Sequence, residues 1–213
     1  MSRIAIIGGH GKVALHLARD LSANGHQVTS LFRNPDHTAD VEAAGAAAVV
    51  ADVENLSTDE IAQKLAGQDA VVWSAGAGGG SAERTYAVDR DAAIRSMDAA
   101  KAAGVSRYVM VSYFGAGPDH GVPEDDGFYA YADAKAAADE YLRSSGLDWT
   151  ILGPSALTDD PGTGAISVGP GQDGSVSRTD VAAVAAQVLE RPGTIGQFIE
   201  FINGDTPIRE AIG

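Results

Sequence analysis

Arg3-Ile-Ala-Ile-Ile-Gly-Gly-His-Gly-Lys-Val-Ala14 is the stretch of this chain that decides its fold. Its apolar run, Ile4–Ile7, has the length of a buried strand and leads directly into a cluster of glycines. Apolar residues at helical spacing begin at Val13, and Gly25 stands where a glycine typically ends a helix. A strand, a glycine turn and a helix in this order can cradle a phosphate, because the first N–H groups of the helix point at the anion. The stretch therefore predicts a dinucleotide-binding domain.

The glycines fit two spacing patterns. Counted from Gly9, the sequence through Ala14 is G-x-G-x-x-A, a variant of the Rossmann fingerprint G-x-G-x-x-G. Counted from Gly8, it is G-x-x-G-x-x-A. An ordinary strand-to-helix turn is the alternative, but the flanking strand and helix supply the context that a cofactor loop requires. The residues that we expect to contact the cofactor here are Gly8, His10, Gly11, Lys12 and Val13.

The composition excludes several classes of protein. A length of 213 residues suits one α/β domain, and no apolar run is long enough to span a membrane. The absence of cysteine excludes disulfides and thiolate chemistry, and the five histidines lack metal-ligand spacing. A net charge of −14 argues against nucleic acid as a partner. We expect a cytoplasmic protein, because the first strand begins too early for a signal peptide to precede it. We further expect a monomer or homodimer that binds neither a membrane nor a metal ion.

Strand-like and helix-like segments alternate along the chain. The predicted strands are Arg3–Ile7, Gln27–Arg33, Ala47–Ala51, Ala70–Ser74, Arg107–Ser112, Asp148–Ile151 and Gln197–Phe201. The predicted helices are Lys12–Asn24, Thr38–Ala44, Thr58–Leu65, Thr85–Ala103, Tyr129–Ser144 and Thr179–Glu190. This order predicts an α/β fold: one Rossmann-type domain over residues 1–213, with a doubly wound parallel sheet and helices on both faces. Ser177-Arg-Thr-Asp180 is typical of a capping box, and the Gly- and Pro-rich segment Ser155–Ser177 predicts an irregular substrate-side loop region.

Open parallel sheets bind ligands at the carboxyl ends of their strands, so the next candidates lie there. Arg33 ends the second strand, where an NAD site usually has an acidic residue. Its guanidinium suits the 2′-phosphate of NADP(H), which makes NADP(H) the preferred cofactor. In the alternative, Arg33 is a solvated strand end, Asp36 accepts from the ribose hydroxyl, and NAD(H) is bound. After the third and fourth strands, we expect cofactor contacts from Asp52, Val53, Ala75 and Gly76.

A second constellation is Tyr131-Ala-Asp-Ala-Lys135. A spacing of four residues on a helix places the phenol and the ammonium on one face, a turn apart. The ammonium can stabilise a phenolate and hold the cofactor ribose, while the phenol exchanges a proton with a substrate carbonyl or hydroxyl. In the alternative, the helix is an alanine-rich surface helix whose Lys135 pairs with Asp139 and whose Tyr131 packs in the core.

These features together resemble the atypical short-chain dehydrogenases/reductases, in the NAD(P)-binding, epimerase-like group that is similar to flavin and biliverdin reductases and to NmrA-like redox sensors. The residues that carry the resemblance are Gly8–Ala14, Arg33, Asp52, Ala75, Gly76, Ser112, Tyr131, Lys135, Pro154 and the tail Asn203–Ile208. The resemblance implies that Tyr131 and Lys135 are catalytic and that Lys135 also contacts the cofactor. It implies further that the segment after the sixth strand approaches the nicotinamide through Pro154, Ser155 and Leu157, with Gly153 in place of the family's arginine.

The chain departs from the family at two polar positions. The family's usual serine position is occupied by Phe114, so Ser112 and the less supported Tyr113 are the hydroxyl candidates, and Asp89 stands where an asparagine is common. Two functional hypotheses follow. The first is an NADP(H)-dependent oxidoreductase or epimerase-like enzyme acting on a small molecule, with Tyr131, Lys135 and Ser112 as its catalytic residues. The second is a non-catalytic sensor of the NADPH/NADP⁺ ratio.

Overall fold

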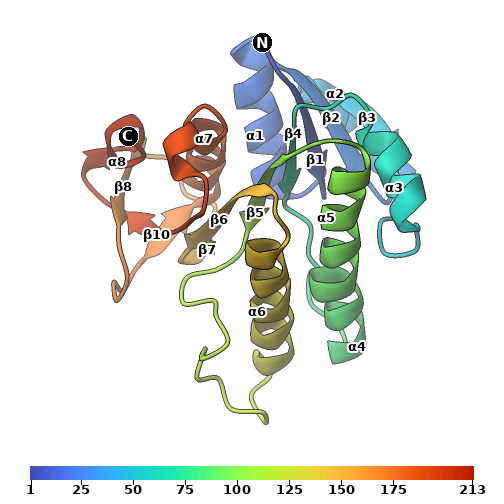
Figure 1. The fold of residues 1–213 in the computed structure, drawn as a ribbon. Coiled ribbons are helices and arrows are strands. Elements are labelled where there is room, and N and C mark those ends of the chain that lie inside the picture. Colours follow the sequence, from blue (N-terminus) through green and yellow to red (C-terminus); the bar gives the residue numbers. More distant parts are fainter.

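Seven neighbouring parallel strands make up all but one edge of a nine-stranded sheet (Figure 1). The computed structural model describes all residues 1–213. The parallel strands are β1 (Arg3–Ile7), β2 (Gln27–Phe32), β3 (Ala47–Val50), β4 (Ala70–Trp73), β5 (Arg107–Val111), β6 (Asp148–Pro154) and β10 (Gln197–Asn203). In space they run β10-β6-β5-β4-β1-β2-β3, so the chain winds outward from β1 in one direction and then from β4 in the other. The doubly wound Rossmann-type order predicted from the sequence is confirmed.

Helices cover both faces of the sheet. They are α1 (Lys12–Ala23), α2 (Thr38–Ala43), α3 (Thr58–Leu65), α4 (Ala82–Thr85), α5 (Ala93–Ala102), α6 (Tyr129–Ser144), α7 (Arg178–Leu189) and α8 (Ile208–Ala211). The core under α1 and α7 is separate from the core under α3, α5 and α6. Figure 1 shows α5 and α6 side by side on the second of these faces. None of the helices combines the length and the apolar character needed to cross a bilayer.

Strand β1 shows why an unbroken apolar run forms the centre of such a sheet. Ile4, Ala5, Ile6 and Ile7 are all 0–1% exposed. Because successive side chains on a strand point to opposite faces, Ile4 and Ile6 join the core under α1, whereas Ala5 and Ile7 join the core under α5. A strand that is covered on both faces needs apolar residues at every position. A strand with one solvent-exposed face needs them only at every second position.

The predicted element boundaries agree with the structure to within a few residues in most cases. The helix expected at Thr85–Ala103 differs, because it starts earlier at α4 and contains a π-helical turn, η2 (Tyr86–Ala92), before α5. Two 3-10 turns, η1 (Pro35–His37) and η3 (Pro192–Thr194), complete the helical segments. Strand β6 runs three residues further than predicted, to Pro154.

The segment Ser155–Ser177 is not irregular, which corrects the prediction. It contains β7 (Ala156–Thr158), β8 (Ala165–Val168) and β9 (Ser175–Ser177). Strand β8 pairs antiparallel with β10, and β11 (Thr206–Pro207) pairs antiparallel with β8, so one edge of the sheet is not parallel. These strands are two to four residues long and separated by glycines, and such short segments carry no readable period.

The capping box predicted at the start of α7 forms only in half. Ser177 accepts a hydrogen bond from the Asp180 N–H, as a capping serine does. Asp180, however, does not reach back to the Ser177 N–H, which donates to the Asn203 side chain instead. The Asp180 carboxylate accepts from the N–H groups of Thr163 and Gly164. It therefore fixes the loop before β8, a long-range use that the local motif does not reveal.

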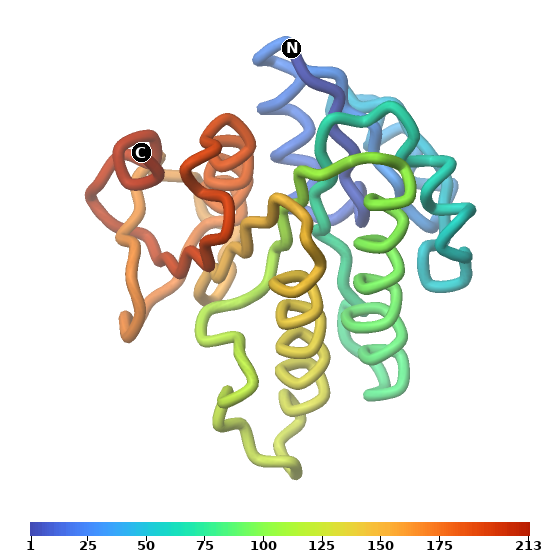
Figure 2. Tube along the Cα trace, viewed as in Figure 1, coloured from blue at the N-terminus to red at the C-terminus, as the bar shows by residue number.

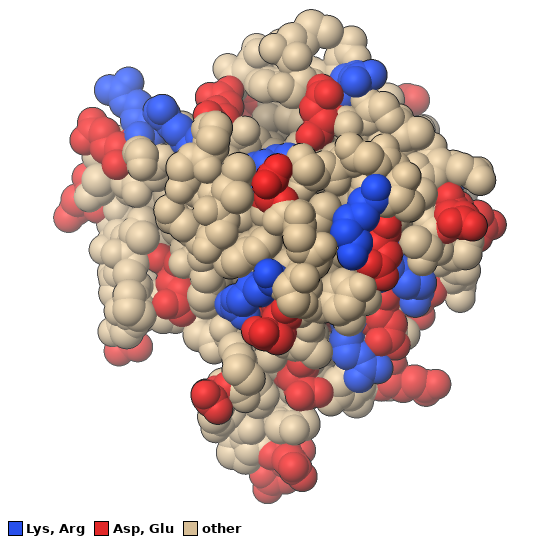
Figure 3. Space-filling view, viewed as in Figure 1, with Lys and Arg blue, Asp and Glu red and all other residues tan.

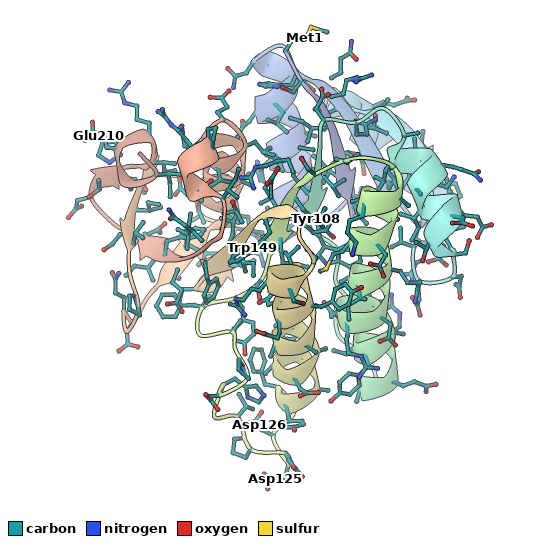
Figure 4. All side chains as sticks on the ribbon, in the orientation of Figure 1. Met1, Tyr108, Asp125, Asp126, Trp149 and Glu210 are labelled. Atoms are coloured by element: carbon teal, nitrogen blue, oxygen red, sulfur yellow. The ribbon has the colours of Figure 1, made fainter.

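The connection from β5 to α6 leaves the sheet as a long loop. Figure 2 shows this segment, in yellow-green, at the end of the molecule opposite to both chain termini. Asp125 and Asp126 lie at its tip in Figure 4, and acidic side chains gather there in Figure 3. The loop thus extends the carboxyl edge of the sheet, where ligands of such folds bind.

Candidate active site

The glycine turn after β1 requires glycine for steric reasons. Gly8 has φ +84°, and a Cβ built on it would lie 2.5 Å from both N and Cα of Ala75, which follows β4. A Cβ on Gly9 would lie 2.4 Å from the Cβ of Ser30 on β2. The N–H groups of Gly8 and Gly9 both donate to the Leu31 carbonyl, at 3.0 and 2.9 Å. The turn is therefore pressed between the two neighbouring strands.

The N-terminus of α1 presents unpartnered N–H groups beside this turn. Gly11 is its N-cap and supplies no side-chain cap, and no acidic residue lies in the first turn. The first backbone bond of the helix runs from the Leu15 N–H to the Gly11 carbonyl at 2.9 Å. The N–H groups of Lys12, Val13 and Ala14 precede it and have no intrahelical acceptor. Such a terminus fits an anionic group, as predicted for a pyrophosphate.

A pocket of about 290 Å³ opens at the carboxyl ends of β1 to β4. Eight predicted cofactor residues line it: Gly8, His10, Gly11, Arg33, Asp52, Val53, Ala75 and Gly76. The lining residues that the sequence analysis missed are Leu31, Phe32, Asn34, His37, Ala51, Glu54, Ser74, Ala77, Arg84 and Val88. Most of these are adjacent in sequence to a predicted residue. Arg84 is different, because it lies on α4 and no motif in the sequence indicated that it would line the pocket. Because the pocket lies beside the glycine turn and the end of β2, we expect it to hold the adenosine half of a dinucleotide, and we call it the adenosine pocket.

Arg33 and Asp52, two of the polar pocket residues, already have partners within the chain. Arg33 lies 3.7 Å from a carboxylate oxygen of Glu54. Asp52 accepts from the Glu54 N–H at 3.3 Å and from the Asn55 side chain at 2.9 Å, so it organises its own turn as well as facing the pocket. Asp36, the alternative acceptor for the ribose hydroxyl, does not line the pocket.

Tyr131 and Lys135 share one face of α6, as predicted, and this face packs against the protein interior instead of facing solvent. Lys135 is 1% exposed, and its ammonium donates to the Val111 carbonyl at 2.8 Å and lies 3.4 Å from the Met110 sulfur. It forms no ion pair with Asp139, so the alternative of a solvated helix with that pair is wrong. The Tyr131 ring packs against Tyr113 and Phe128, with centroids 5.5 and 5.2 Å away.

Two buried carboxyl groups flank this pair. Asp89, on the π-helical turn, accepts from the Ala77 N–H at 3.0 Å, and Asp139 lies one turn beyond Lys135. Burial raises the pKa of both carboxyl groups. Burial also raises the pKa of Tyr131, and the charges of Asp89 and Asp139 raise it further. Burial lowers the pKa of Lys135, an effect that the two carboxylates oppose. The phenol is therefore protonated at neutral pH.

The hydroxyl candidates after β5 differ in availability. Ser112 donates to Asp139 at 2.5 Å and is buried, so its hydroxyl is already engaged. Phe114, at the family's serine position, has its N–H bonded to the Pro154 carbonyl. The Tyr113 hydroxyl is buried and has no hydrogen-bond partner, and burial raises the pKa of this phenol. Among these residues, only Tyr113 has an unused polar atom beside Tyr131.

The residues predicted near the nicotinamide lie outside the pocket. The Ser155 N–H donates to the Phe201 carbonyl, and its hydroxyl donates to Gly174. Leu157 is 37% exposed. Lys12 reaches across to this segment, with its ammonium 2.5 Å from Asp159, which Arg178 also contacts at 2.8 Å. The segment is thereby tied to the start of α1, and its contact with a cofactor remains a prediction.

The glycine turn, the open helix terminus and the pocket fit a nicotinamide dinucleotide. The comparison with protein families agrees: the NAD(P)H-binding family model matches residues 8–192. The chain belongs to this family. This match, together with the epimerase-named relatives described next, confirms the predicted resemblance to the atypical, epimerase-like group.

Named relatives cover almost the full length. The Bacillus subtilis protein named "Uncharacterized sugar epimerase YhfK" is 36% identical over 99% of this chain and 98% of its own. A Bacillus halodurans structure, with an unproven assignment as an NAD-dependent epimerase/dehydratase, has a TM-score of 0.92 and 34% identity, covering 100% of this chain and 99% of its own. The oxidoreductase ylbE of Lactococcus lactis has a TM-score of 0.87 and 31% identity, covering 99% of this chain and 94% of its own.

Proposed function

We propose that this protein is an NADP(H)-dependent oxidoreductase in which Tyr131 donates a proton to the substrate. The observation that carries the proposal is the pairing of Tyr131 with Lys135 one turn apart on α6, where Lys135 is buried and its ammonium donates to the Val111 carbonyl and to no carboxylate. A buried ammonium that serves no ion pair is costly for the fold, and such groups are typical of active sites. The relatives named as epimerase or oxidoreductase support the same broad class.

The cofactor supplies the hydride when it is bound, and the remaining steps belong to this chain. The phenol of Tyr131 carries its proton at neutral pH, as an ordinary tyrosine does, and burial and two carboxylates raise its pKa further. It can therefore give a proton to an oxygen or nitrogen that gains negative charge during reduction. The ammonium of Lys135 then stabilises the phenolate that remains.

Substrate binding is assigned to the aromatic side chains beside Tyr131. The rings of Tyr113 and Phe128 contact Tyr131, and Phe128 is 45% exposed. The Tyr113 hydroxyl is the second donor that could hold the substrate oxygen. The acidic tip of the loop between β5 and α6 argues against polyanionic substrates.

Arg33 supports NADP(H) over NAD(H), because a guanidinium at the end of β2 suits a 2′-phosphate. The pocket around it has no carboxylate from Asp36 to accept from a 2′-hydroxyl.

The test is NADPH oxidation with a panel of quinones, flavins and aldehydes. We expect Tyr131→Phe to lower turnover by at least about a hundredfold, the usual contribution of a positioned acid, with NADPH binding unchanged. Tyr129→Phe is the matched control, because Tyr129 lies on the same helix and packs against His120. Activity that survives Tyr131→Phe unchanged removes Tyr131 from the mechanism.

A non-catalytic sensor is the second candidate, and one observation favours it. The Ser112 hydroxyl is bonded to Asp139 and Phe114 replaces the family's serine, so the usual substrate-binding hydroxyl is missing. A sensor would bind NADPH tightly and turn over none of the acceptors. The rate at which a protease cleaves its loop between β5 and α6 would differ between the NADPH-bound and the NADP⁺-bound protein.

A further inference from the structure

Two guanidinium groups and one carboxylate meet in the adenosine pocket. A single oxygen of Glu54 lies 3.7 Å from the Arg33 guanidinium and 3.4 Å from that of Arg84. All three residues line the pocket, although they come from the ends of β2 and β3 and from α4. Neither arginine has another carboxylate within ion-pair distance. The pocket therefore contains an anion site that the chain fills with its own carboxylate.

The three side chains are held to different degrees. Arg84 also donates to the Ala77 carbonyl, which anchors its guanidinium beside the turn after β4. The backbone of Glu54 is fixed, because its N–H donates to Asp52 and its carbonyl accepts from Arg95 at 2.8 Å. The Glu54 carboxylate has no hydrogen bond besides these two ion pairs. It can leave the arginines by a side-chain rotation without moving the backbone.

We propose that Arg84, together with Arg33, binds the 2′-phosphate of NADP(H), and that Glu54 occupies this position until the phosphate displaces it. Paired guanidinium groups suit a phosphate monoester, which offers three acceptor oxygens and close to two negative charges. Glu54 balances only one of the two positive charges, so the phosphate is the better partner. The inference rests on the proposed preference for NADP(H).

Glu54 then has two effects on cofactor choice. It weakens NADP(H) binding, because its contacts with both arginines are lost when the phosphate enters. It supports NAD(H) binding, because a carboxylate near the ribose can accept from a 2′-hydroxyl. The competition would make the preference for NADP(H) weaker than two arginines alone would give.

Titrations of NADPH, NADH, 2′,5′-ADP and 5′-AMP by calorimetry or fluorescence test the proposal without any substrate. We expect Glu54→Gln to tighten binding of 2′,5′-ADP by about three- to tenfold and to leave 5′-AMP within about twofold, the size of a partly exposed charge contact. We expect Arg84→Gln to weaken 2′,5′-ADP by about tenfold, as for lost charge-assisted bonds, with little change for 5′-AMP. Arg84→Lys, which keeps the charge, should fall in between.

Glu83→Gln is the matched control for Glu54→Gln, because it removes the same charge from a residue that is next to Arg84 on α4 but does not line the pocket. Unchanged 2′,5′-ADP affinity in either Glu54→Gln or Arg84→Gln, with wild-type circular dichroism, overturns this inference alone if the wild type prefers 2′,5′-ADP over 5′-AMP. A wild type that shows no such preference overturns both the inference and the proposed use of NADP(H). If Glu83→Gln tightens 2′,5′-ADP binding as much as Glu54→Gln does, the effect comes from net charge, and the inference is again overturned.

Discussion

The Ser112 hydroxyl and the Asp139 carboxylate are joined by a 2.5 Å hydrogen bond between the end of β5 and the middle of α6. The bond lies in the interior, where Asp139 is 0% exposed and its second carboxylate oxygen has no partner. A buried carboxylate depends on each donor that it has. Ser112 thus serves as the partner of a buried acid, whereas the sequence pattern predicted a substrate-binding role.

Ser112→Ala should therefore act mainly on stability. Removing the hydroxyl leaves the Asp139 carboxylate with no donor, which should lower the free energy of unfolding by about 1–3 kcal/mol. Urea unfolding measures this effect, and Ser144→Ala, which alters an exposed hydroxyl on the same helix, is the control. If Ser112→Ala abolished NADPH oxidation at unchanged stability, the hydroxyl would be a catalytic group after all.

Asp139→Asn should change the pH dependence of stability. The native pKa of Asp139 lies above 3.8, its ordinary value, because the group is buried. The native state therefore keeps this proton to a higher pH than the unfolded chain. The carboxyl stabilises the fold most below pH 3.8, and stability is lost as the pH rises through the native pKa. Asparagine cannot ionise, so the variant should gain on the wild type across this window.

Urea unfolding at a series of pH values from 3.5 upward checks the sign of this difference, since the window opens at about the ordinary pKa of an aspartate. Glu140→Gln is the control, because its carboxylate is 66% exposed on the outer side of α6. A difference between Asp139→Asn and wild type that stays constant with pH would mean that Asp139 is not held in a desolvated site.

Gly8→Ala should lower stability by more than the cost of placing an alanine at a positive φ, because the new Cβ also clashes with a neighbouring strand end. The new Cβ would meet the Ala75 backbone at 2.5 Å, and the residue would keep φ +84°. We expect a loss of about 2–4 kcal/mol in unfolding free energy, since overpacking and backbone strain add. Gly25→Ala, with φ +82° and open space around it, isolates the conformational part. Equal losses in the two variants would show that the contact with Ala75 relaxes freely.

Lys12→Met should weaken NADPH and NADH equally. Lys12 is the first residue of α1, beside the predicted position of the pyrophosphate that both cofactors share. We expect a loss of roughly tenfold for each, the scale of one charge-assisted contact. Parallel titrations of the two nucleotides decide the matter, with Lys64→Met on α3 as a control for net charge. A loss confined to NADPH would move Lys12 to the 2′-phosphate.

Much of the fold could be predicted from the sequence because its signals are local. The unbroken apolar run Ile4–Ile7, the glycine turn and the spacing of Tyr131 and Lys135 each fall within a few residues of the sequence. In the structure the glycine turn and the strand ends that carry Arg33 and Asp52 line one pocket, and their contact with a cofactor stays a prediction.

The rest depends on contacts between distant residues. Ser112 meets Asp139 across 27 positions, and Arg84 meets Glu54 from a helix that follows the next strand, β4. No periodicity records such pairings. The antiparallel edge formed by β8 also escaped prediction, because a strand of four residues acquires its partner from the sheet and not from its own sequence.

The π-helical turn η2 makes the adenosine pocket sensitive to the length of the chain. Each residue of an α-helix turns the chain by about 100°. A π-helical turn contains one extra residue, so the turn over Tyr86–Ala92 rotates α4 relative to α5 by about this angle. Deleting a single residue there would restore a regular α-helix and carry Arg84 out of reach of Glu54, while α5 stayed anchored in its core. Within this helix, an insertion or deletion could change cofactor selectivity without any substitution among the pocket-lining side chains.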